Sequence, residues 1–154
     1  MNAEARFQAL ADSTSEVPLD ALHDLFDSLP AIEPSFMLGA WDGGVFRTGH
    51  EGEKQLASIG WIGKTFHDEN DVDPIIRRSA DGGREPNPVL GKATLRFVRY
   101  RGVSTATMVY DQHPIIDHFR KITGDLVLGV TDKKGDAFPL YFYLRRRSAA
   151  TTAG

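Results

Sequence analysis

The sequence predicts a mostly β protein whose antiparallel strands close into a barrel, with helices at its N-terminus and one helix before the last hairpin. Seven segments after residue 36 have strand-like patterns and are joined by short, turn-rich connections. Both tryptophans, Trp41 and Trp61, lie between closely spaced glycines within such segments. Because glycine in a strand marks a corner or a close approach, an indole there suits the plugged end of a small barrel.

The composition is that of one ordinary globular domain. A chain of 154 residues with 41% hydrophobic and 25% charged residues is long enough to bury a core without covalent cross-links. The absence of cysteine excludes disulfides, thiolate nucleophiles and cysteine-based zinc sites. A formal net charge of -3 argues against non-specific nucleic-acid binding, which requires a basic surface. We therefore expect no nucleic-acid partner.

The N-terminal residues do not have the pattern of a targeting segment. Glu4, Arg6 and Asp12 interrupt the apolar core that a secretory signal needs. No stretch approaches the ~18 apolar residues of a membrane-spanning helix. We expect a cytoplasmic protein with no integral membrane contact.

Residues 1–35 are predicted to form a helical lead-in to the barrel. Phe7 and its apolar neighbours favour a short helix over residues 3–11. Pro18 suits the first turn of a second helix over residues 18–28, in which leucine and phenylalanine recur at spacings of three and four. Two prolines then end the helix, so that these helices are expected to cover part of the barrel.

A β-barrel domain is predicted over residues 36–147, followed by a disordered tail at 148–154. Alternation is clearest in the last strand, where Leu140 and Phe142 share one face and polar or aromatic residues share the other. One buried face and one wetted face are typical of antiparallel sheet. The predicted strands cover residues 37–47, 55–66, 72–79, 89–100, 103–110, 125–132 and 138–147.

One helix is predicted to interrupt the strands at residues 114–122. Pro114 suits its first turn, and Ile115 and Phe119 belong to an apolar stripe at helical spacing. Gly124 lies near the position at which helices commonly end. This helix, or the N-terminal pair, is expected to act as a lid over the barrel.

Six segments carry a resemblance to a known family. Leu38–Gly43, Thr48–His50 and Trp61–Phe66 resemble the motifs of the GXWXG family of bacterial and plant proteins. Tyr110–Arg120, Leu128–Lys133 and Tyr141–Arg146 resemble the uncharacterised domain that usually follows it. The resemblance implies a GXWXG part at about 36–95 and a companion part at about 96–147, within a single structural domain. It supplies no established activity and no catalytic residues.

Two looser likenesses concern the fold. The Gly-x-Trp pattern near the first strand, after a short helical segment, is similar to the opening motif of lipocalins. The same segment resembles the opening of small haem-binding barrels related to nitrobindin. Both likenesses imply a barrel of the lipocalin or fatty-acid-binding-protein type, whose interior holds one small ligand.

The function predicted from these features is binding of an apolar or amphiphilic small molecule, of the fatty-acid or phospholipid class, inside the barrel. Lys64 and Arg78 lie near predicted strand ends, where a cation would hold the carboxylate or phosphate of an amphiphile. Aromatic residues would line the cavity. The predicted ligand-binding residues are Trp41, Phe46, Trp61, Lys64, Phe66, Arg78, Phe97, Tyr110, Phe119 and Phe142.

Other functions stay open as alternatives. No histidine spacing fits a metal site, and no cofactor is predicted; His118 is the ligand to test if the barrel binds haem. No nucleophile or acid–base motif indicates an enzyme, although the cavity would accommodate one if polar side chains such as His50 and Lys64 converge inside it. A solidly packed barrel would instead indicate an interaction module, and a homodimer is compatible with that alternative.

Overall fold

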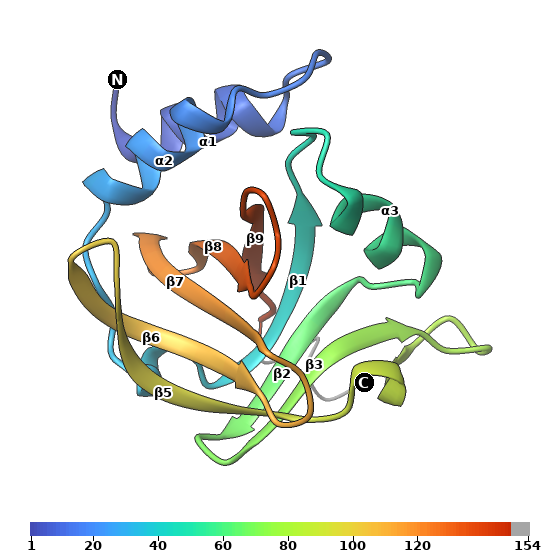
Figure 1. The fold of residues 1–154 in the computed structure, drawn as a ribbon. Coiled ribbons are helices and arrows are strands. Elements are labelled where there is room, and N and C mark those ends of the chain that lie inside the picture. Colours follow the sequence, from blue (N-terminus) through green and yellow to red (C-terminus); the bar gives the residue numbers. More distant parts are fainter. Residues whose placement is uncertain (149–154) are drawn as a thin grey trace.

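The strand-rich part of the chain forms a closed barrel of eight antiparallel strands in the computed structural model, which describes residues 1–148 (Figure 1). The predicted fold class is thereby confirmed. The barrel strands are β1 (Gly39–Val45), β2 (Gly63–Asp68), β3 (Asp71–Arg78), β5 (Ala93–Tyr100), β6 (Val103–Tyr110), β7 (Ile115–Thr123), β8 (Leu126–Lys133) and β9 (Leu140–Arg146).

Each strand pairs with two neighbours, in the order β1, β9, β8, β7, β6, β5, β3, β2 and back to β1. The pairing between β3 and β5 is the shortest in the ring, and in it Val72 lies directly opposite Ala93. A short additional strand, β4 (Arg84–Pro86), pairs with the outer end of β3. Closure leaves the ring without a free edge, which an open sheet would have to protect.

Two cores lie on either side of the barrel wall. The inner core fills one part of the barrel, where Trp41, Phe66 and Phe119 pack with aliphatic side chains from the surrounding strands. The outer core lies between the N-terminal helices and the outside of β7, β8 and β9, with Phe26 and Tyr141 among its fully buried residues. The strands of this wall are therefore apolar on both faces.

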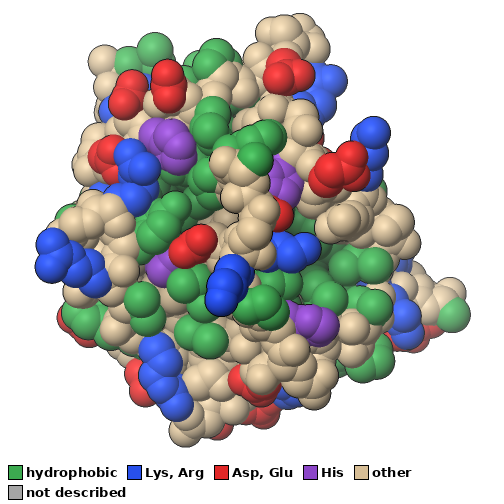
Figure 2. All heavy atoms as spheres, viewed as in Figure 1, with side chains coloured by type: hydrophobic (Ala, Val, Ile, Leu, Met, Phe, Trp, Pro, Cys, Tyr) green, Lys and Arg blue, Asp and Glu red, His purple; other side chains and the backbone are tan. Residues whose placement is uncertain are grey.

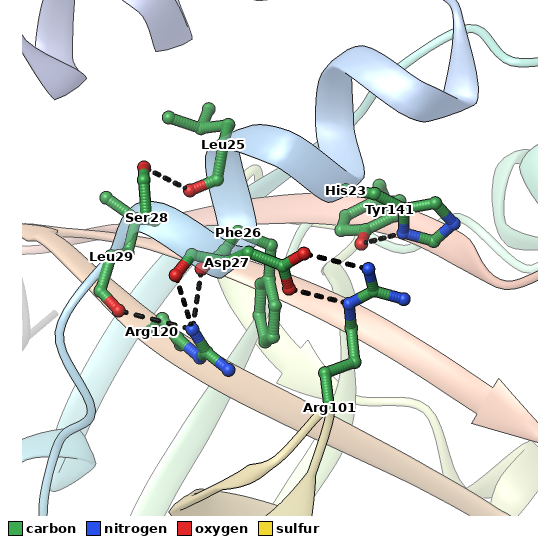
Figure 3. A network of polar contacts seen from close by, with 9 residues as sticks. All are labelled: His23, Leu25, Phe26, Asp27, Ser28, Leu29, Arg101, Arg120 and Tyr141. Atoms are coloured by element: carbon green, nitrogen blue, oxygen red, sulfur yellow. Dashed lines mark hydrogen bonds and ion pairs between the residues drawn. The ribbon is translucent and has the colours of Figure 1, made fainter.

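The N-terminal helices were correctly predicted and are α1 (Ala3–Ala11) and α2 (Leu19–Ser28). The apolar side of α2 presents Leu22, Leu25 and Phe26 to the outer core. Arg120 of β7 donates from Nη1 to the carbonyl oxygens of Phe26, Asp27 and Leu29 at 2.9–3.3 Å, which anchors the end of α2 to the barrel (Figure 3). These helices therefore cover the outside of the barrel wall. The sequence analysis gives them as one of two alternatives for a lid over the barrel, which is a different position.

The helix predicted at residues 114–122 is wrong, because this segment is strand β7. Its four central residues, from Asp117 to Arg120, are all buried. The inner core covers one face of the strand and the outer core covers the other, so the apolar/polar alternation of a half-exposed strand is lost. What remains in the sequence is a closely spaced apolar pattern that a helix would also show.

The strand predicted at residues 55–66 is correct only in its second half. Residues Glu51–Ser58 form a third helix, α3, and β2 begins at Gly63. His50 caps α3, and Glu53 completes a capping box by accepting a hydrogen bond from the His50 N–H at 3.0 Å. Gly60, one of the glycines beside Trp61 from which a strand corner is predicted, instead follows the helix with a φ of 72° and so occupies the left-handed position typical of helix ends.

Two short 3-10 helices complete the described chain, η1 (Pro34–Met37) before β1 and η2 (Pro88–Leu90) before β5. No helix within residues 1–148 combines the length and the hydropathy needed to cross a bilayer. The tail predicted to be disordered, 148–154, lies outside the described residues except for Ser148.

Candidate functional site

A cavity of about 350 Å³ occupies the part of the barrel that the inner core leaves unfilled. Helix α3 forms one side of it, and the facing ends of β6 to β9 form the other. In the space-filling view, hydrophobic side chains are visible between charged and histidine side chains on the face seen in Figure 1 (Figure 2). The residues that line it include Trp61, Lys64, Tyr110, Asp117, Thr131 and Phe142.

An ion pair lies across the inner end of this cavity. Lys64 is on β2 and Asp117 is on β7, and three strands separate them in either direction around the ring. Their side chains meet in the interior, with Lys64 Nζ 3.3 Å from Asp117 Oδ2. Both side chains are almost completely buried. Sequence alternation placed Lys64 near a strand end but gave no indication of this partner.

The position of Lys64 depends on an irregularity in the neighbouring strand. Between the pairs Gly63–Ile76 and Thr65–Asp73 the register of β2 and β3 shifts, so that Lys64 lies opposite Pro74 and its neighbour. Proline has no N–H for the ladder and is therefore tolerated in a strand at such a bulge. Its carbonyl oxygen accepts a hydrogen bond from Lys64 Nζ at 3.0 Å.

Three aromatic rings surround the Lys64 ammonium. Its Nζ lies 5.4 Å from the ring centroids of Trp61 and Phe142 and 5.8 Å from that of Tyr110. At this distance the negative ring faces attract a cation, which offsets part of the cost of removing it from water. The cavity is therefore an aromatic enclosure that already holds a lysine of the protein itself.

Burial shifts the protonation equilibria of this cluster. It lowers the pKa of Lys64 and raises the pKa of Asp117, while each residue opposes the shift of the other through their attraction. Burial, reinforced by the nearby Asp117, raises the pKa of Tyr110 well above its ordinary value, so this phenol stays neutral. The pair has zero net charge whether both groups are ionised or a proton has moved from Lys64 to Asp117.

Two polar atoms of the site have no hydrogen-bond partner within residues 1–148. They are Asp117 Oδ1 and Trp61 Nε1, and both are buried. Thr131 lies directly across the ladder from Asp117 and acts to lower the pKa of Asp117 through a side-chain hydrogen bond, but Oδ1 itself is left without a partner in hydrogen-bonding geometry. Since buried polar atoms in proteins are normally paired, these two atoms are an unsatisfied acceptor and an unsatisfied donor in side chains that line the cavity.

Two glycines allow aromatic rings of the cavity wall to lie directly against the backbone of the barrel strands. The Trp61 ring lies against Gly43 of β1, so closely that any side chain at Gly43 would overlap with it. The Phe142 ring lies in the same way over Gly129 of β8. The two rings then meet edge to face, with centroids 5.9 Å apart. Gly43, one of the glycines beside Trp41, is therefore a place of close approach, as predicted from the sequence, and Gly129 is a second one that was not predicted.

The outer end of the cavity is bounded by α3 and the loop between β8 and β9. His50 Nδ1 accepts a hydrogen bond from the Gly52 N–H at 2.8 Å, so a neutral His50 carries its proton on Nε2. That nitrogen lies 3.0 Å from Asp136 Oδ2. Because His50 and Asp136 both line the cavity, this contact joins its two sides.

The residues predicted from the sequence divide into two sets. Trp61, Lys64, Tyr110 and Phe142 line the cavity. The other six lie elsewhere: Trp41, Phe66 and Phe119 in the inner core, Phe46 in the outer core, Phe97 on the surface with 52% of its area exposed, and Arg78 beside a separate polar hollow with Asp42 and Arg84.

His118, the haem-ligand candidate, is on the outer side of β7, facing away from the cavity. Its ring stacks on Tyr100 with centroids 4.0 Å apart, and its Nδ1 lies 2.9 Å from the Thr107 hydroxyl. Burial lowers the pKa of His118 to about 4. Within residues 1–148 no group of three acidic or histidine side chains is arranged to hold a metal ion.

Asp117 was the main residue that sequence reasoning missed, because the segment around it was interpreted as a helix. In a strand, Asp117 shares a face with Ile115 and Phe119. An acidic residue on an otherwise apolar strand face is the signal that would have identified it.

Comparisons with known proteins give two family matches and one structural match. The GXWXG protein family matches residues 24–82, and a domain of unknown function (DUF4334) matches residues 91–146. The chain has no match among curated proteins. A crystal structure of a protein from Thermomonospora curvata is similar over 96% of this chain and 100% of that one, with 40% sequence identity and a TM-score of 0.89.

Proposed function

Since the chain belongs to the GXWXG family, here joined to its companion domain of unknown function, we propose that it binds one small amphiphilic molecule in the barrel cavity. The observation that carries this proposal is the combination of an unfilled volume with aromatic walls and a buried polar pair at its inner end. Natural ligand sites combine apolar walls with a few convergent polar groups in this way. The four lining residues predicted from sequence are the proposed contacts.

The volume limits the size of the ligand. A cavity of about 350 Å³ has room for roughly a dozen non-hydrogen atoms if each takes the ~30 Å³ of a water molecule. A compact aromatic or a medium-length chain fits this space, whereas a two-chain phospholipid is too large to be enclosed. Burial of its hydrocarbon would supply most of the affinity, at about 0.8 kcal/mol per methylene.

Two neighbouring isoleucines provide a matched test. Ile115 lines the cavity, whereas Ile116 is the next residue of β7 and faces the other side of the wall. We expect naphthalene to bind the natural protein and Ile116→Trp in titration calorimetry, and to fail to bind Ile115→Trp because the indole fills the cavity. Absence of binding to the natural protein, together with no small molecule in an organic extract of the purified protein, would contradict the proposal.

A second candidate is an enzyme that performs acid–base chemistry on the bound molecule. It is favoured by the convergence of Lys64 and Asp117 at the cavity, with the Tyr110 ring beside the Lys64 ammonium. The Asp117 carboxylate would take a proton from the carbon next to a ligand carbonyl, and the Lys64 ammonium would stabilise the resulting enolate. Deuterium uptake by 1-tetralone in D₂O, followed by NMR, tests this. Exchange no faster than in buffer, or unchanged in Asp117→Asn, would contradict it.

A further inference from the structure

We propose that the cavity selects a neutral hydroxyl compound, an alcohol or a phenol, over the corresponding carboxylate. The inference rests on the proposed binding function and specifies the ligand class. It departs from the sequence-based expectation that Lys64 holds the carboxylate or phosphate of an amphiphile. Two independent features of the cavity carry it, its charge and its unpaired polar atoms.

The charges that line the cavity do not favour an anion. Lys64 already has Asp117 as its counter-ion at 3.3 Å and Pro74 as a carbonyl acceptor at 3.0 Å. Glu51 and Asp136 also line the cavity, with Lys133 as the other cation, so three acids face two lysines. A ligand carboxylate at the inner end would lose its hydration close to Asp117, and the cation there, Lys64, already has a counter-ion.

The unpaired atoms call for a ligand group that both donates and accepts. Asp117 Oδ1 is an acceptor without a donor, and Trp61 Nε1 is a donor without an acceptor. Both residues line the same cavity. A hydroxyl group has one donor hydrogen and two acceptor lone pairs, whereas an ionised carboxylate has only acceptors. A hydrogen bond to an ionised Asp117 would also be stronger than one between neutral groups.

Three naphthalene derivatives of about a dozen non-hydrogen atoms separate the effect of the ligand's charge from the effect of its hydroxyl donor. At pH 7, 2-naphthol is neutral with a hydroxyl donor, 2-methoxynaphthalene has no donor, and 2-naphthoate is an anion. Titration calorimetry of the natural protein is expected to give a Kd for 2-naphthol that is at least about tenfold lower than for either of the others.

Two variants test whether the preference for a neutral hydroxyl compound arises at the cavity. Asp117→Asn keeps an acceptor oxygen but leaves the Lys64 charge uncompensated, so 2-naphthoate is expected to bind at least about tenfold more tightly than to the natural protein. Asp125→Asn is the matched control, because Asp125 is 83% exposed in the turn before β8. It is expected to leave all three affinities unchanged.

The affinities of the three naphthalene derivatives for the natural protein test the proposed preference even if the Asp117→Asn variant fails to fold. Equal or tighter binding of 2-naphthoate, or equal binding of 2-methoxynaphthalene and 2-naphthol, overturns the neutral-hydroxyl preference and leaves the proposed binding function standing. Failure of all three compounds, and of naphthalene, to bind, together with no small molecule in an organic extract of the purified protein, overturns both.

Discussion

Lys64 and Asp117 lie on strands at opposite sides of the barrel, and their side chains meet at 3.3 Å across its interior. The contact joins the two matched regions of the chain, because Lys64 lies within residues 24–82 and Asp117 within residues 91–146. Removing either partner would leave a buried charge without its counter-ion, which is among the costliest changes that one substitution makes.

Substitution of Lys64 by methionine is therefore expected to lower the free energy of unfolding by about 3 kcal/mol at pH 8. The pKa of Asp117 is raised in the folded protein, and loss of Lys64 raises it further. The folded state then binds more protons than the unfolded state above the ordinary carboxyl pKa, so the variant loses stability as the pH rises. Urea unfolding at pH 5 and pH 8 checks the size and the sign.

The double variant Lys64→Met/Asp117→Leu is the control for this prediction. With both charges replaced by apolar groups, the protein is expected to regain most of the lost stability. A double variant no more stable than Lys64→Met would show that lost packing of the lysine side chain, and not the unpaired carboxylate, causes the effect.

Gly43 is expected to tolerate no side chain without a change in the cavity. A methyl group there would overlap with the Trp61 ring, which must then move away from β1. We expect Gly43→Ala to cost about 1–3 kcal/mol of unfolding free energy and to shift the tryptophan fluorescence spectrum. Gly124→Ala is the control, because nothing lies near its added methyl group and its backbone is not in the left-handed region. Equal behaviour of the two variants would contradict the packing argument.

The two arginines near the end of α2 are expected to contribute unequally to stability (Figure 3). Arg120 is buried and donates to three carbonyl oxygens at the end of this helix, so Arg120→Met removes this donor from all three and is expected to cost about 2 kcal/mol. Arg101 forms a partly exposed bidentate pair with Asp27, so Arg101→Met is expected to cost less than about 1 kcal/mol. Thermal unfolding measures both, and the reverse order would contradict this assignment.

His118 is expected to make the protein less stable as the pH falls. Its pKa is about 4 in the folded protein because it is buried, against 6.5 in an unfolded chain. Between these values the unfolded state binds the proton and the folded state does not, so stability declines from pH 6.5 to pH 4, by at most about 3 kcal/mol. His118→Gln is expected to flatten this part of the profile. His113→Gln, at an exposed position, is the control and should leave the slope unchanged.

The sequence by itself determined the local parts of this protein. Residue alternation with period two specified most of the strands, helical spacing specified α1 and α2, and a glycine beside Trp41 marked a place where a ring approaches the backbone. These features depend on neighbours in the chain and so can be recognised from a short stretch of residues. The family motifs, likewise, are contiguous.

The tertiary structure decided what occupies the space between those parts. Strand β7 was hidden because helix α2 buries its outer face, and Asp117 was overlooked with it. Of ten residues predicted to contact a ligand, the closed ring brought four to one cavity and sent the others to the two cores, the surface and a separate hollow. Side chains from opposite strands meet only when the ring closes in one register, and that register is a property of all eight strands together.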